Sequence, residues 1–175
     1  MISFIEILRL IIVTLAIGYI FSGLIRIPIL KSKYEDLKLA VYVAAPAVIL
    51  HELMHKFVAI SLGLKAEFFA SYFGLLFGII LRLFNSPLLI LVPGYVTIPM
   101  TTPLKGAIVA FSGPFTNLLL WLMALLLLRM KNLSNKQVLF LSLTRRINII
   151  LFMFNMIPIP PFDGAKVLNG IISLF

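Results

Sequence analysis

The chain has 175 residues, of which 62% are hydrophobic and only 12% are charged. A soluble domain usually carries about 45–50% apolar and about 25% charged residues, so this chain lacks the polar side chains that would cover it in water. The composition therefore predicts an integral membrane protein, with the lipid bilayer as its surroundings. The net charge of +9 does not indicate a nucleic-acid partner, because the basic residues lie at the ends of apolar segments and not along one soluble face. The absence of cysteine excludes disulfides, thiolate metal sites and cysteine nucleophiles.

Four apolar segments are long enough to cross the hydrocarbon core, which takes about 20 residues of helix. They predict a membrane all-α fold in a single domain over residues 1–175. The first segment lacks a small-residue cleavage site, so we expect a retained helix and not a signal peptide. We expect the charged stretch after it, residues 31–38, to form a loop, and Gly63 to end the second span. The expected spans are residues 10–25, 39–62, 104–128 and 138–157.

The segment between the second and third spans, residues 65–102, does not read as a further crossing. Its longest apolar run, residues 68–81, is shorter than a crossing needs. Short β-branched and aromatic pieces then alternate with Pro and Gly, which is typical of strands or of a re-entrant hairpin. Non-helical backbone at membrane depth is stable only when it is buried in protein or lines a watery cavity. We therefore expect a small membrane-associated β-hairpin or re-entrant segment beside a cavity.

The second span contains the pattern HExxH, as His51-Glu52-Leu-Met-His55. Residues four apart share one helix face, so both imidazoles can bind one metal ion, while Glu52 points beside them towards the reacting water. Ionisable side chains inside a membrane span are costly and usually functional. The alternative is a structural polar cluster between helices, but such contacts normally need one or two polar residues and not a set with metal-ligand spacing. Both histidines of the chain belong to the pattern, which indicates a metal site.

A catalytic zinc takes three protein ligands, so one more must come from elsewhere in the chain. There is no third histidine, and the carboxylates after the pattern are Glu67 and Asp163. Glu67 follows too closely for an easy return to the site. Asp163 comes after the proline-rich break that ends the fourth span, where Gly164 lets the backbone turn towards a neighbouring helix. Pro-Phe-Asp-Gly is also an ordinary turn sequence, but elimination favours Asp163 as the third ligand. The apolar residues 165–175 that follow predict a terminal amphipathic helix or a span that stops early.

Two sequences together resemble the site-2 protease family of intramembrane zinc metalloproteases. They are the HExxH pattern and the later sequence Asn155-Met-Ile-Pro-Ile-Pro-Pro-Phe-Asp163-Gly164, in an order of segments that covers about residues 39–168. Gly113-Pro114 with Asn117 is similar to a feature of the middle core helix of that family. A second Gly is common in the family where this chain has Ala165. The resemblance implies a three-helix catalytic core, in a minimal form without a PDZ or regulatory domain.

The resemblance also implies a role for each site residue. Zinc would be held by His51, His55 and Asp163. Glu52 would be the general base, and Asn155 would lie near the scissile carbonyl and stabilise the oxyanion. We expect structural contacts from two other asparagines, Asn117 and Asn148.

The implied function is an intramembrane zinc metalloprotease that hydrolyses peptide bonds in or near transmembrane segments of membrane protein substrates. Such a substrate must be unwound locally, and an exposed strand edge in residues 65–102 could hold it extended. A non-catalytic membrane metal-binding or scaffold protein is one alternative, although zinc binding alone does not need Glu52. A small transporter is another, although further histidines or carboxylates to continue a path across the membrane are lacking. The substrate and the oligomeric state stay open.

The resemblance implies a cell-membrane location with the active site towards the cytoplasm. The basic residues give the opposite indication. Residues 26–38 and 129–136 together carry seven Lys and Arg on the other side, which the positive-inside rule would place in the cytoplasm. The side of the site has Lys65, Arg82, Lys105 and Lys166.

Overall fold

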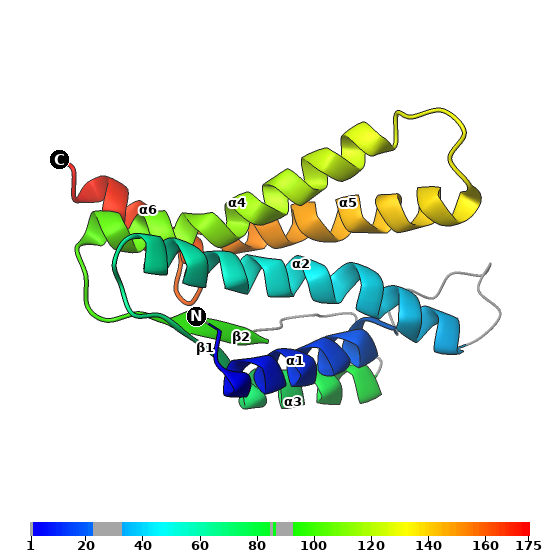
Figure 1. Cartoon of the computed structure of the whole chain (residues 1–175), viewed down its shortest axis with the longest axis horizontal. Coiled ribbons are helices and arrows are strands. Elements are labelled where there is room, and N and C mark those ends of the chain that lie inside the picture. Colours follow the sequence, from blue (N-terminus) through cyan, green and yellow to red (C-terminus); the bar gives the residue numbers. More distant parts are fainter. Residues whose placement is uncertain (1, 23–32, 85, 87–92) are drawn as a thin grey trace. The chain divides into compact units, whose positions relative to one another are not determined.

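The computed structural model of the chain describes residues 2–22, 33–84, 86 and 93–175. Within these ranges the chain forms six helices and one two-stranded sheet (Figure 1). In chain order the elements are α1 (Phe4–Ser22), α2 (Lys33–Ser61), β1 (Glu67–Ala70), α3 (Tyr72–Leu83), β2 (Gly94–Thr97), α4 (Pro103–Leu127), α5 (Asn135–Asn155) and α6 (Asp163–Ile172).

Of the helices that the structure describes, four are long and apolar enough to cross a membrane: α1, α2, α4 and α5. The chain is an integral membrane protein of the membrane all-α class, as its composition predicts. The end of the first expected span, residues 23–25, lies outside the described residues. The expected loop at residues 31–38 is wrong from Lys33 onwards, because α2 already begins there. Glu35 and Asp36 occupy its first turn, where the helix dipole stabilises acidic side chains.

The ends of the spans follow local sequence signals. Gly63 has a positive φ of 78°, directly after the end of α2, as expected for a glycine that stops a helix. The side chain of Thr102 accepts a hydrogen bond from the Lys105 N–H, so it caps α4. Ser134 and Gln137 form a reciprocal capping box that starts α5. Each of these contacts satisfies backbone groups that a helix end leaves without a partner.

The segment between α2 and α4 contains both strands and a helix. β1 and β2 pair into the small sheet, which confirms the expected hairpin. The apolar run at residues 68–81 divides between β1 and α3, and the Ser71 side chain caps α3 by accepting from the Gly74 N–H. Residues 87–92, part of the same segment, lie outside the described residues.

The described residues group into two compact units, Met1–Ile49 with Phe68–Tyr95, and Leu50–Glu67 with Val96–Phe175. In the first unit, α1 packs against α3 and is tied to β1. Ser3 and Glu6 exchange backbone-to-side-chain hydrogen bonds that cap α1. Glu6 Oε1 also accepts the Phe68 N–H at 2.8 Å, and Arg9 Nη1 donates to the Phe68 carbonyl at 2.7 Å. Both polar backbone groups of Phe68 are therefore held by side chains of α1.

In the second unit, α4 packs against both α5 and α6 (Figure 1). The contact with α6 depends on Gly170, since a Cβ there would collide with Ala107 and come within 3.0 Å of the Pro103 carbonyl oxygen. Close helix approach at a small residue is the usual way in which membrane helices pack. This unit also contains the carboxyl half of α2, with the HExxH pattern, so all the expected site residues belong to it.

Candidate metal centre

Three side chains converge in the second unit, from two elements far apart in the sequence. His51 and His55 lie one turn apart on α2, and Asp163 is the first residue of α6. The two Nε2 atoms are 3.0 Å apart, and each lies 3.2 Å from Asp163 Oδ2. The histidines are buried and the aspartate is half-buried. Among the residues that the structure describes, these three side chains form the group whose possible ligand atoms lie close enough together to bind one metal ion.

Asp163 reaches the histidines because the loop after α5 returns to the end of that helix before α6 begins. Gly164, the next residue, is packed against the backbone at the end of α5. A Cβ on it would come within 2.6 Å of the Ile157 carbonyl oxygen and closer still to that of Met156. The absence of a side chain at Gly164 therefore lets the start of α6 lie against the end of α5. In this position the Asp163 carboxylate faces the histidines of α2.

The hydrogen-bond partners of the Nδ1 atoms show which nitrogen of each histidine has a free lone pair. His51 Nδ1 is 2.6 Å from Asn117 Oδ1, and His55 Nδ1 is 2.7 Å from the Val109 carbonyl oxygen. Both partners are acceptors, so each Nδ1 carries the hydrogen, and in a neutral ring the Nε2 then has a free lone pair. Two lone pairs and a carboxylate oxygen consequently face one another, and this arrangement needs a cation between them.

A metal ion fits this donor set better than a proton does. A carboxyl must be ionised to bind a metal ion, and Asp163 Oδ2 lies 3.2 Å from each Nε2 atom, where such an ion would sit. A proton on one ring satisfies only part of the set, whereas one metal ion satisfies all three atoms. Ligand bonds of about 2.0–2.1 Å in a tetrahedron separate the ligand atoms by about 3.3 Å. The observed separations of 3.0–3.2 Å are close to that value.

Gly113 on α4 keeps the space in front of these nitrogens open. A Cβ at this position would lie 2.7 Å from His51 Nε2 and 2.5 Å from His55 Cε1. Any larger residue would therefore fill the place where the ligand atoms point. In the sequence, Gly113-Pro114 is recognised only as a motif. The structure explains why a glycine is needed at position 113, since a side chain there would collide with both histidines.

Glu52 is also buried, next to His51 on α2. One residue turns a helix by about 100°, so its side chain lies to one side of the histidine face. Among the described residues, the ligand cluster contains His51, His55 and Asp163 and does not include Glu52. A carboxylate beside a metal cluster, and not in it, is placed to accept a proton.

Asn155 is a second expected site residue that, like Glu52, is not part of the cluster. It is the last residue of α5, and its Nδ2 donates to the Leu151 carbonyl at 2.9 Å within the same helix. Its described interactions do not join it to the histidines or to Asp163.

Two other asparagines are joined to the cluster instead. Asn117 contacts His51, and its Nδ2 donates to Asn148 Oδ1 at 2.9 Å. Sequence reasoning expected only structural contacts from this pair. The spacing could have indicated more for Asn117, since it stands four residues after Gly113 and shares the face of α4 that covers the histidines.

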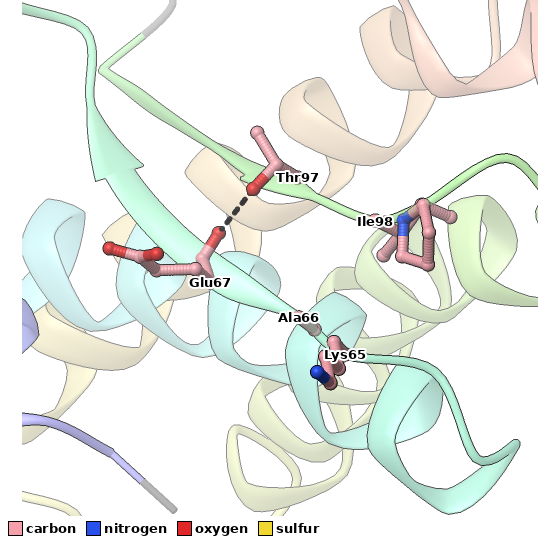
Figure 2. A pocket seen from close by; sticks show the side chains of 6 residues that line it. Lys65, Ala66, Glu67, Thr97 and Ile98 are labelled. Carbon is pink, nitrogen blue, oxygen red and sulfur yellow. Dashed lines mark hydrogen bonds between the residues drawn. The ribbon is translucent and has the colours of Figure 1, made fainter.

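A separate hollow of about 430 Å³ lies in the second unit, where β1 begins and β2 ends (Figure 2). The Thr97 hydroxyl donates to the Glu67 carbonyl at 3.3 Å beside it, as Figure 2 shows. The metal cluster is not part of its lining, which consists of Lys65, Ala66, Glu67, Thr97, Ile98 and Pro99.

Comparison with known proteins identifies the family to which the chain is similar. The model of the family described as peptidase family M50 matches residues 39–138. A protein of Methanocaldococcus jannaschii, named as a candidate zinc metalloprotease, is 35% identical over 171 residues, which cover 94% of this chain and 83% of that protein. A Bacillus subtilis protein with the same type of name is 30% identical over 78 residues, covering 39% of this chain and 36% of that protein. No solved structure matches the chain.

Proposed function

Because the chain belongs to peptidase family M50, we propose that it is an intramembrane zinc metalloprotease that hydrolyses peptide bonds in or near transmembrane segments of membrane proteins. The observation that carries this proposal is the converging set of two lone pairs and one carboxylate, with a further carboxylate beside it. We propose that His51, His55 and Asp163 hold zinc and that Glu52 is the general base. In this proposal the whole chain acts as one membrane protease domain, with its core at about residues 39–168.

Zinc bound there would act as a Lewis acid that polarises the scissile carbonyl and makes the attacking water more acidic. Glu52 would accept a proton from that water as it attacks and would pass the proton to the leaving amine. The carboxylate can carry out both transfers because it stands beside the ligands and is not one of them. Burial of the site keeps bulk water from competing for these polar contacts.

Asn155 is proposed to donate a hydrogen bond to the developing oxyanion. Its amide donates to the Leu151 carbonyl in its own helix, so it would have to exchange that partner for the substrate. Catalytic hydrogen bonds often form only when the substrate is present, so this exchange is compatible with the proposed role.

The substrate side of the proposal involves the small sheet. A helical substrate hides its carbonyls in its own hydrogen bonds, and pairing with a strand edge would keep it unwound. The Phe68 N–H and carbonyl of β1 are already bonded to Glu6 and Arg9, so we propose β2 as the edge that receives the substrate. We further propose a cell-membrane location with the site towards the cytoplasm. Accessibility tags inserted before α4 and between α4 and α5 would test this orientation.

The proposed function can be tested on the purified protein in lipid vesicles with a panel of single-span membrane proteins. The parent is expected to cleave at least one panel member, and both a zinc chelator and Glu52→Gln should abolish cleavage, with zinc retained in the variant. Glu35→Gln is the matched control, since it removes an exposed carboxylate from the same helix. A parent that holds zinc and cleaves no panel member would overturn the protease assignment and favour a non-catalytic metal-binding protein.

A further inference from the structure

We propose that Asn117 and Asn148 are positioning residues, which hold the proton of His51 on Nδ1 and so keep its Nε2 aimed as a metal ligand. The proposal rests on the metal site proposed above and assigns a task to α5, a helix that supplies no ligand to the cluster. It is built from three hydrogen bonds that run in one direction, from a backbone carbonyl on α5 through α4 to the histidine on α2.

The chain of bonds begins at the Thr144 carbonyl, one turn before Asn148. Asn148 Nδ2 lies 2.8 Å from this oxygen. A carbonyl can only accept, so the amide of Asn148 must present its NH₂ group to Thr144. Its own oxygen, Oδ1, is then left facing α4.

The same logic fixes the amide of Asn117. Asn148 Oδ1 is an acceptor, so the group 2.9 Å from it must be the NH₂ of Asn117. Asn117 Oδ1 then faces His51 Nδ1 at 2.6 Å, and that nitrogen has to donate. Turning either amide over would place acceptor against acceptor or donor against donor, so the backbone carbonyl decides the position of the proton on His51.

Burial fixes the donor and acceptor directions of these hydrogen bonds. Asn117 is 0% and Asn148 1% exposed, which leaves solvent little access as an alternative partner. Such groups in a low-dielectric interior are costly to leave unpaired, and a fully satisfied network specifies one arrangement. A partner of this kind for the second nitrogen of a ligating histidine sets the ring orientation and the ligand strength.

His55 provides an internal comparison in the same site. Its Nδ1 bonds directly to the Val109 carbonyl on α4, so its proton position does not depend on either asparagine. Removal of an asparagine should therefore affect the two histidines unequally. General loosening of the site would affect both.

The test uses zinc-loaded protein with ¹⁵N-labelled histidine, which gives a simple spectrum because the chain has two histidines. We expect Asn117→Leu and Asn148→Leu to move the His51 Nδ1–H resonance upfield and to speed its exchange with solvent, while the His55 resonance stays in place. Zinc affinity, measured by competition with a chelator, should fall about 10-fold to 100-fold. Asn135→Leu, an exposed position on α5, should match the parent in both measurements.

A conservative variant keeps the test decisive if the leucine variants do not fold. Asn117→Asp retains an acceptor for His51 Nδ1, so the His51 Nδ1–H signal should persist, while Asn148 has to turn its NH₂ from Thr144 to the second carboxylate oxygen. Loss of the His51 Nδ1–H signal in a folded Asn117→Asp variant would overturn the proposal, as would unchanged His51 signals in a folded leucine variant, or equal shifts of both histidines. None of these measurements depends on cleavage, so failure of the protease assignment would be seen separately.

Discussion

Gly113 on α4 lies so close to His55 on α2 that a methyl group on its Cα would come within 2.5 Å of the imidazole carbon Cε1 and 2.7 Å from His51 Nε2. The two helices can therefore meet at the metal site only where one of them has no side chain. In the proposed site, metal binding and the contact between the two helices therefore depend on the same residue.

Gly113→Ala should therefore impair the site directly. The added methyl group would have to displace either α4 or the imidazoles, and we expect zinc affinity to fall by at least about 10-fold, as for other changes beside a metal ligand. Gly106→Ala is the matched control on the same helix, because its nearest contact would be the Thr101 side chain at 3.9 Å. Equal zinc content in the two variants would contradict this reading of Gly113.

Asp163→Asn should weaken metal binding by removing the anionic ligand while keeping the shape of the side chain. Loss of a charge that contacts both Nε2 atoms at 3.2 Å is expected to lower zinc content after dialysis against a mild chelator. Glu67→Gln, the other carboxylate that follows the HExxH pattern, should retain the metal. If zinc stays bound after Asp163→Asn and also after replacement of both histidines, the ligand assignment is wrong.

Asn155→Ala should reduce cleavage without loss of zinc. Removal of one hydrogen-bond donor to an oxyanion costs about 10²–10³ in kcat. Metal content and KM should change little, since the described contact of Asn155 is with its own helix. Asn135→Ala serves as the control for an asparagine on α5 outside the site. A rate within about 2-fold of the parent would remove Asn155 from the proposed mechanism.

The tie between α1 and β1 should be visible in hydrogen exchange. Glu6→Leu leaves the buried Phe68 N–H without its partner, which costs about 1–3 kcal/mol, and the Phe68 amide should exchange correspondingly faster. Ser3→Ala separates this effect from the helix cap, since it removes the cap bond and keeps the bond to Phe68. The same rate increase in Ser3→Ala would attribute the effect to fraying of α1.

Much of the fold follows from local patterns in the sequence. Four apolar runs predict the four described spans, because the bilayer core sets the length of an apolar helix and leaves little choice of structure. The HExxH spacing places His51 and His55 on one face for the same local reason. The error at residues 31–38 arose where acidic residues read as a loop although they stabilise the first turn of a helix.

Other features depend on how distant segments meet, which local periodicity does not specify. Scarcity of carboxylates pointed to Asp163, but its place beside the histidines depends on the packing of Gly164 against the end of α5. The rotation of α4 and α5 about their axes brings Asn117 to His51 and Asn148 to Asn117, and leaves Asn155 bonded within its own helix. The sequence by itself determined the type of membrane fold and placed His51 and His55 on one face of a helix. Only the tertiary structure decided which polar groups surround them, because the hydrogen bonds between α2, α4 and α5 join residues that lie far apart in the chain.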